Sequence, residues 1–196
     1  MDTAALFSTW RRVNPVGWLL AARRAITARV RDGRELASGH SAVARPTEVG
    51  RVVSIARKHA HRAPMELLEE GQITAERGLE GNVSGRPGRR QITVVAREGW
   101  ADACRDLGRD VPWTTRRANL LVEGLGVARR VGARLEMGQV LLEITGETTP
   151  CTRMEEQVAG LAAALERDWR AGVTCRVLRG GTVRVGDVAR LAEPAD

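Results

Sequence analysis

The sequence predicts a mainly β domain of the α+β type, an antiparallel β-barrel or curled sheet with a few peripheral helices. Many short runs of β-branched residues alternate with glycine-rich turns, which is typical of antiparallel strands joined by tight links. Only two or three segments show helical periodicity, so a parallel sheet of βαβ units fits poorly. Aromatic residues are scarce, with five Trp, one Phe and no Tyr among 196 residues. The core is therefore expected to be aliphatic.

The expected strands lie between clear turn signals. In chain order they are residues 51–56, 91–96, 118–122, 134–137, 140–144, 173–178, 182–185 and 187–191. Gly138-Gln139 and Gly180-Gly181 each separate two of these runs, and glycine-containing links of this kind predict hairpins. Residues 78–88 contain four glycines and one proline, which predicts a loop.

Three segments predict helices. Residues 98–107 bring their apolar side chains to one face, and Gly108 follows them as a typical helix C-cap. Residues 155–169 repeat apolar side chains at helical spacing. Pro64 occupies a favoured first-turn position and predicts a short helix to about residue 70.

The chain is expected to divide into an N-terminal extension, residues 1–47, and a β-barrel domain, residues 48–196. The extension holds an arginine-rich segment over residues 18–31 that fits one helix, followed by Gly, Ser, Ala and Arg without periodicity. Three interpretations stay open for it. It is a flexible tail, a translated region before the true start, or a helix for a membrane surface or a partner.

The net charge of +7 does not predict nucleic-acid binding. Residues 1–50 contain eight Arg and four acidic residues, so they account for +4 of the total and leave +3 for the rest. Lys58 is the only lysine in the chain. A nucleic-acid interface needs a basic stripe, whereas charges of both signs are interspersed here.

Cysteine usage and hydropathy predict a soluble protein of a reducing compartment. The three cysteines cannot all pair with one another and have no metal-type CxxC spacing. No apolar run approaches the ~20 residues of a membrane span, so no integral membrane segment is expected. A cytoplasmic location follows as the expectation.

Cys151 is the strongest candidate for chemistry. Pro150 ends the preceding extended segment, and a helix is expected to begin just after the cysteine. The amides and dipole of a helix N-terminus, together with Arg153, favour a thiolate, which can act as a nucleophile or a soft-metal ligand. The alternative is a small buried hydrophobic residue, and Cys104 and Cys175 are expected to be of that kind.

Other candidates are weaker by themselves. The loop over residues 78–88 exposes backbone amides that suit an anion, and Arg90 follows it closely. Arg117 and Asn119 are two positions apart at the start of an expected strand, which predicts that they project to the same side. His59 and His61 share this spacing, but no third metal ligand is evident. The sequence contains no HExxH motif, no Ser-His-Asp order and no paired carboxylates, which disfavours a hydrolase.

Taken in order, several segments resemble the MOSC domain family, whose domain also forms the C-terminus of molybdenum-cofactor sulfurases. The resemblance runs from Gly50 to about Leu191. Its carriers are GRVVSI (residues 50–55), GLEG (78–81), TRRANLLVE (115–123), residues 134–144 with their glycine turn, TPCTRM (149–154) and GVTCRVLRGGTVRVGD (172–187).

The resemblance implies a β-barrel that binds a molybdenum–pterin cofactor, with Cys151 as the sulfur ligand to molybdenum or as a sulfur-carrying residue. The expected activity is an oxidoreductase that reduces N-hydroxylated small molecules, with electrons supplied by a reductase partner. The expected cofactor-binding residues are Arg117, Asn119, Arg153, Gly81, Asn82, Ser84, Arg90 and Thr149. The alternatives are a sulfur carrier that holds a persulfide on Cys151 and takes sulfur from a donor, or a catalytically silent cofactor-binding domain.

The sequence departs from the family pattern after the GLEG turn, where the family usually carries an acid and a histidine. Asn82 and Ser84 stand there instead. Asn82 accepts a hydrogen bond without bringing charge, and Ser84 cannot shuttle protons near pH 7. Pyridoxal phosphate is not expected, because Lys58 is the only lysine that could form a Schiff base.

Overall fold

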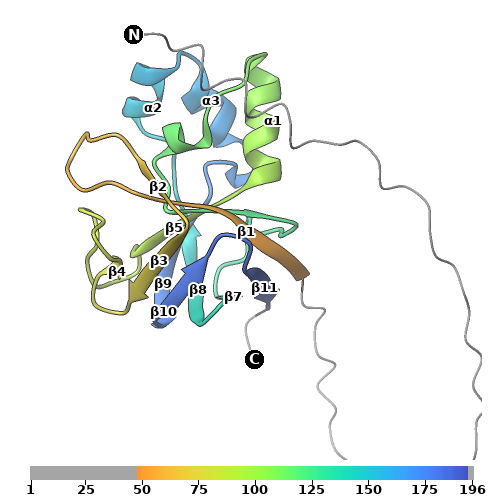
Figure 1. The fold of residues 1–196 in the computed structure, drawn as a ribbon. Coiled ribbons are helices and arrows are strands. Elements are labelled where there is room, and N and C mark those ends of the chain that lie inside the picture. Colours follow the sequence, from red (N-terminus) through yellow and green to blue (C-terminus); the bar gives the residue numbers. More distant parts are fainter. Residues whose placement is uncertain (1–47, 194–196) are drawn as a thin grey trace, which may run out of the picture. The chain divides into compact units, whose positions relative to one another are not determined.

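The computed structural model describes residues 48–193, which form a closed seven-stranded β-barrel with helices packed at one end (Figure 1). The predicted mainly β class is confirmed. The extension predicted for residues 1–47 lies outside the described residues. The barrel strands are β1 (Glu48–Arg57), β5 (Ile92–Ala96), β6 (Leu120–Glu123), β7 (Arg134–Met137), β8 (Val140–Glu147), β9 (Val173–Arg179) and β11 (Val188–Ala192).

Around the barrel the strands follow the order β1, β6, β5, β9, β8, β7 and β11, and β11 pairs back with β1. All of these pairs are antiparallel except β5 with β6, which is parallel. The short strand β2 (Glu66–Leu68) pairs antiparallel with the last residues of β1. A separate three-stranded sheet is formed by β3 (Glu70–Thr74), β4 (Gly78–Leu79) and β10 (Gly181–Arg184).

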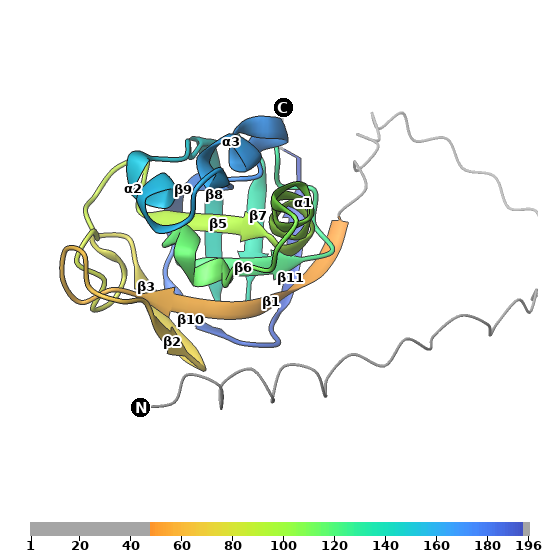
Figure 2. The same cartoon turned by 90° about the horizontal axis from the view of Figure 1, so that it is seen from above.

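The helical elements gather over one end of the barrel, as the view from above shows (Figure 2). They are α1 (Arg97–Leu107), η3 (Trp113–Arg116), α2 (Thr152–Gln157), α3 (Leu161–Glu166) and η4 (Arg167–Trp169). Helix α1 carries the chain from β5 to its parallel neighbour β6, as a crossover connection must. The one βαβ unit is thus built into an otherwise antiparallel barrel, which the sequence pattern did not predict.

Two clusters of buried aliphatic side chains hold the domain together, as the scarcity of aromatics predicts. The larger fills the barrel and includes Ile55, Val94, Leu135, Leu142 and Ile144, all without exposed surface. The second lies under the helices and includes Trp100, Met154, Leu161 and Leu165. Burial of this kind contributes about 25 cal/mol for each Å² of apolar surface.

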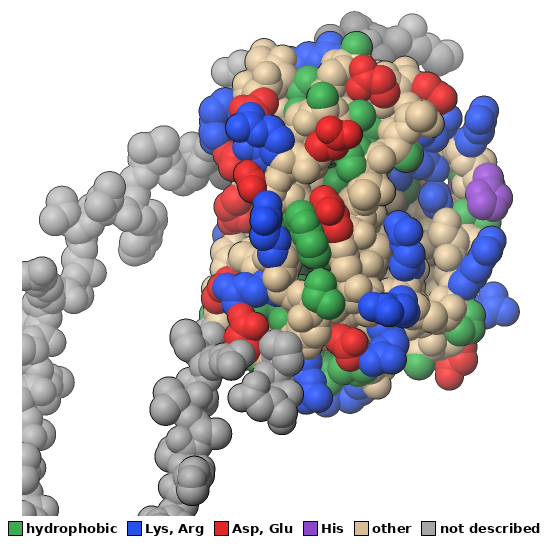
Figure 3. Space-filling model, turned by 180° about the vertical axis from the view of Figure 1, so that it is seen from behind, with side chains coloured by type: hydrophobic (Ala, Val, Ile, Leu, Met, Phe, Trp, Pro, Cys, Tyr) green, Lys and Arg blue, Asp and Glu red, His purple; other side chains and the backbone are tan. Residues whose placement is uncertain are grey.

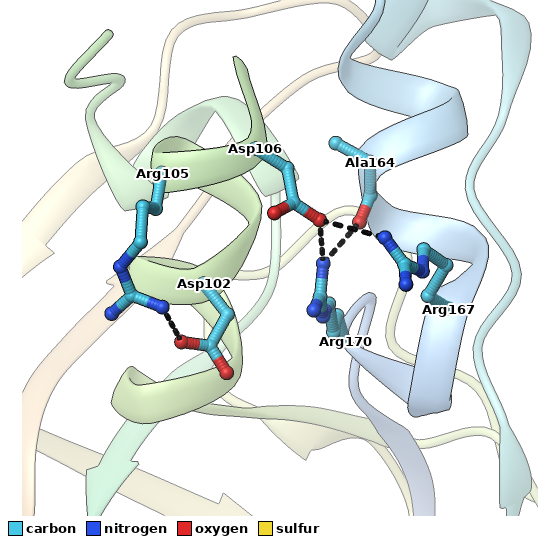
Figure 4. A network of polar contacts seen from close by, with 6 residues as sticks. All are labelled: Asp102, Arg105, Asp106, Ala164, Arg167 and Arg170. Atoms are coloured by element: carbon cyan, nitrogen blue, oxygen red, sulfur yellow. Dashed lines mark hydrogen bonds and ion pairs between the residues drawn. The ribbon is translucent and has the colours of Figure 1, made fainter. Parts of the chain in front are cut away.

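A polar network ties α1 to the chain after α3 (Figure 4). The Asp106 carboxylate accepts hydrogen bonds from Arg170 at 2.5 Å and from Arg167 at 3.2 Å. Arg170 also donates to the backbone carbonyl of Ala164 at 3.4 Å. The network joins α1 to α3 and to the segment that follows it.

Three local predictions are wrong. Residues 64–70 are not helical, because residues 66–68 pair with the end of β1 and Glu66 forms an ion pair with Arg57. The helix predicted over residues 155–169 is broken at Gly160, which adopts a left-handed conformation with φ of +84°. The Gly180-Gly181 link does not make a hairpin, because β9 pairs with β5 and β8 while β10 pairs with β3.

Several predictions are confirmed. Gly138 turns the β7–β8 hairpin, and Gly108 caps α1 in the left-handed conformation. No helix within residues 48–193 has the length and apolar character to cross a membrane.

Candidate functional site

Cys151 lies at the junction between the barrel and the helical layer. Strand β8 ends at Glu147, three residues follow, and Cys151 is the N-cap of α2 with extended backbone angles (φ −124°, ψ 163°). Its side chain is exposed, whereas Cys104 and Cys175 are buried, and burial raises the pKa of both buried thiols. Cys151 is therefore the one cysteine of the three that solvent and ligands can reach.

Arg116, at the end of η3, is buried beside this junction with only 5% of its surface exposed. Its Nε donates to the carbonyl oxygen of Ala171 at 2.5 Å. Its Nη2 donates to the carbonyl oxygen of Thr148 at 3.2 Å and to the Thr148 hydroxyl at 2.7 Å. Burial lowers the pKa of Arg116 to about 10, while the nearby Cys151 opposes this shift and Arg90 adds to it. At neutral pH the guanidinium keeps its charge, and these protein acceptors are all uncharged oxygens.

Arg117 and Lys58 add positive charge at the same place. Arg117 adopts a left-handed conformation (φ +61°) and donates to the carbonyl oxygen of Ala63 at 2.9 Å. Burial lowers the pKa of Arg117, and Arg153 lowers it further. Burial also lowers the pKa of Lys58, and repulsion from Arg117 lowers it further. Cys151 acts in the opposite direction and raises the pKa of both Lys58 and Arg117. Both cations therefore lie close enough to the sulfur to interact with its charge.

Arg153, in the first turn of α2, has a hydrogen-bond donor without an acceptor. Its Nε is buried and has no hydrogen-bond partner within residues 48–193. Its Nη1 lies 3.6 Å from the carboxylate of Glu156. A buried donor of this kind is costly to leave unpaired, and an acceptor from a ligand would satisfy it.

The amide side chains predicted to bind a cofactor support the backbone here. Asn119 is buried, accepts from the amide of Thr93 at 3.1 Å and donates to the carbonyl oxygen of Ala56 at 3.3 Å. Asn82 accepts from the amide of Lys58 at 3.2 Å. Arg117 and Asn119 both precede β6, so the strand alternation behind their predicted same-side placement does not apply to them, and their side chains bond to the carbonyl oxygens of Ala63 and Ala56.

The remaining predicted residues lie at the surface. Gly81, Ser84, Arg90 and Thr149 are exposed. A Cβ at Gly81 would lie 2.7 Å from the guanidinium of Arg57, so this glycine makes room for that side chain. Arg90 lies near enough to Arg116 to lower the pKa of that guanidinium.

The structure thus brings Cys151, Arg90, Arg117 and Arg153 together, and it adds Lys58 and Arg116, which the sequence did not single out. Arg116 is adjacent to Arg117, but its burial depends on strand ends far away in the sequence. Figure 3 shows Lys and Arg side chains gathered on the side of the domain that also carries histidine, and both described histidines belong to the β1–β2 connection.

The donor set favours one kind of ligand. Residues 48–193 contain no group of three or more His, Cys, Asp or Glu side chains that could hold a metal ion by themselves. A single thiol beside several cations instead suits a soft metal that arrives with its own anionic organic ligand.

Comparison with known proteins gives a family match and several solved structures of similar fold. The model of the MOSC domain matches residues 57–190. The structure is similar to that of the YuaD protein from Bacillus subtilis, with a TM-score of 0.67 and 19% identity over 76% of this chain and 99% of that chain. It is also similar to YiiM from Escherichia coli, with a TM-score of 0.57 and 18% identity over 74% of this chain and 71% of that chain. Comparison with curated protein sequences finds no significant match.

Proposed function

The chain belongs to the MOSC domain family, and on this premise we propose that it binds a molybdenum–pterin cofactor and reduces N-hydroxylated small molecules. One observation carries the proposal. The exposed cysteine lies within electrostatic reach of Lys58, Arg116 and Arg117, and these cations are not neutralised by ion pairs within residues 48–193. Such an arrangement suits a metal complex with an anionic tail.

The residues present fit this group. The Cys151 sulfur would ligate molybdenum, and Lys58, Arg117 and Arg153 would bind the pterin phosphate through charge and hydrogen bonds. When bound, the cofactor supplies two-electron redox chemistry at molybdenum.

The protein's own part in the reaction is binding and electrostatic. Reduction breaks the N–O bond of the substrate, consumes two electrons and two protons, and releases water. The cations around Cys151 would contribute by holding the anionic part of the cofactor beside the sulfur. The electrons would come from a separate reductase partner, as the resemblance to the family implies.

The first test is the metal content of protein made in a host that synthesises the cofactor. We expect near-stoichiometric molybdenum by elemental analysis, together with pterin fluorescence after oxidation. Cys151→Ser should lose the metal, whereas Cys104→Ala should keep it, because Cys104 is buried in the helical layer. Folded wild-type protein without metal and without pterin would sink the proposal.

A loaded protein should then reduce N-hydroxylated substrates with a chemical electron donor. Unchanged activity in Cys151→Ser would show that the sulfur is not a ligand. Wild-type protein that carries molybdenum but reduces no such substrate would favour the silent cofactor-binding domain. The uncharged Asn82 and Ser84 also favour that alternative.

The exposure of Cys151 favours a second candidate, a sulfur carrier. A persulfide at Cys151 would be accessible to a donor and to an acceptor protein. Mass spectrometry of protein purified without reductant tests this, because a sulfane sulfur adds the mass of one sulfur atom to the peptide with Cys151. The persulfide without molybdenum would favour the carrier, and its absence would count against it.

A further inference from the structure

Arg116 is the cation of this site whose burial neither the sequence pattern nor the proposed chemistry explains. Its guanidinium is almost completely buried, and no carboxylate within residues 48–193 pairs with it. Other arginines of the domain hold carboxylates, as Arg57 does with Glu66 and Arg176 with Glu143. A buried charge without a counter-charge is costly, so its retention calls for a specific role.

The hydrogen bonds of Arg116 show where it acts. Strands β8 and β9 pair up to Glu147 and Val173, and one further backbone bond joins the Thr148 amide to the Gly172 carbonyl at 3.0 Å. Beyond that point the two strands separate. Arg116 bonds to the next carbonyl on each side, Ala171 and Thr148, and so closes the open end of the pair.

This contact controls the short connection to Cys151. Thr148 is buried and bonded to both Gly172 and Arg116, whereas Thr149 is exposed. Thr148 is therefore the last point in the described structure at which hydrogen bonds hold this connection to the barrel. The position of the Cys151 sulfur depends on how firmly Thr148 is held.

We propose that Arg116 is a positioning residue, which fixes the connection between β8 and α2 and thereby holds the Cys151 sulfur in one place. The planar guanidinium is needed because it reaches two carbonyls and a hydroxyl on two different segments at once. The relevance of this role to catalysis rests on the proposed function, but the ordering of the connection does not.

The test uses a nitroxide spin label on Cys151 of the full chain without molybdenum. The label reports on this site alone, because Cys104 and Cys175 are buried. Hydrogen–deuterium exchange of the peptide over residues 147–153 provides a second readout. The variants are Arg116→Lys, Arg116→Gln, Thr148→Val and Thr148→Ser, and Arg176→Gln is the control that removes an exposed arginine from β9.

We expect a more mobile label and about tenfold faster exchange in Arg116→Lys, Arg116→Gln and Thr148→Val. Thr148→Ser keeps the hydroxyl acceptor and should behave as the wild type, and so should Arg176→Gln. Exchange in the barrel strands should not change in any folded variant. This local pattern separates positioning from a general loss of stability.

Two outcomes would overturn the proposal. Wild-type behaviour of Arg116→Lys would show that charge alone suffices and that the guanidinium geometry is irrelevant. Wild-type behaviour of Thr148→Val would show that the hydroxyl contact does not hold the connection, and this variant keeps the test valid if an Arg116 variant fails to fold. Because the measurements need no cofactor, a wild-type protein that binds no molybdenum would contradict the proposed function while leaving this result intact.

Discussion

The Asp106 carboxylate accepts a hydrogen bond of 2.5 Å from Arg170 and joins α1 to the chain that leads into β9 (Figure 4). This bond from Arg170 lowers the pKa of Asp106 below its ordinary value of 3.8, and the charges of Arg170, Arg167 and Arg105 lower it further. The pair therefore stabilises the fold above that value, and the contribution is lost as the pH falls through the lower pKa of the folded state.

The first prediction concerns this pair. Asp106→Asn should lower the Tm at pH 7 by a few degrees, because Arg170 loses its charged partner. The difference from the wild type should shrink as the pH falls from about 3.8, the ordinary pKa at which the unfolded chain takes up the proton, through the lower pKa of the folded carboxylate. Differential scanning calorimetry from pH 2.5 to 7 measures both effects. Asp102→Asn is the control, because Asp102 pairs with Arg105 on the exposed face of α1, and an equal effect there would contradict the assignment.

The second prediction compares two glycines with left-handed backbones, Gly172 at φ +96° and Gly186 at φ +91°. A Cβ at Gly172 would lie 2.3 Å from the carbonyl oxygen of Val94, whereas nothing lies within 4 Å of one at Gly186. Gly186→Ala should lower the free energy of unfolding by about 1 kcal/mol, through strain alone. Gly172→Ala should lower it by about 3 kcal/mol or more, because the strand must also move. Urea denaturation distinguishes them, and equal losses would disprove the close approach.

The third prediction tests the aliphatic interior of the barrel. Leu142 has no exposed surface, and Leu142→Ala should lower the free energy of unfolding by about 2–5 kcal/mol through lost burial and a new cavity. Leu67 on β2 is 61% exposed, so Leu67→Ala should change it by less than about 0.5 kcal/mol. Similar losses at both sites would be inconsistent with a packed barrel interior.

The fourth prediction counts reactive thiols. One cysteine should react with a thiol reagent such as dithionitrobenzoate in the native protein, and three should react after denaturation. Burial raises the pKa of Cys175 and Cys104, which keeps both as unreactive thiols. Cys151→Ala should abolish the native reaction. Two rapidly reacting thiols in the native protein would show that one buried cysteine is accessible.

Local patterns predicted much of the fold. The barrel strands and the helix that ends at Gly108 follow from periodicity and from glycines at tight turns, whereas β3 and β4 were not predicted. The β2 strand was not predicted, because Pro64 and the residues after it carry a helix-start signal and only pairing with β1 overrides it. The break at Gly160 was missed because the apolar spacing continues across it.

Part of the candidate site was also predicted from local sequence patterns. Cys151 and Arg153 are marked by the Pro-Cys step and by the helix that follows. Arg116 and Asn119 carry no local sign of their partners, because Thr148, Ala171 and Ala56 lie far from them along the chain. Arg116 and Arg117 look equivalent in the sequence. Only Arg116 lies at the end of the β8–β9 pair, where it is buried and bonds to Ala171 and Thr148.

The pairing of β1 with β11 has a consequence for how this domain is made. The strand nearest the start of the described chain closes the barrel against the strand nearest its end, with Gly50 opposite Ala189. On the ribosome, closure must wait until the last strand has emerged, so unpaired edges of β1 stay available to chaperones or to other chains during synthesis. In a circular permutant, a short loop would join β11 directly to β1, so their long-range pairing would become a local hairpin. This permutant should refold faster than the protein with its natural chain order.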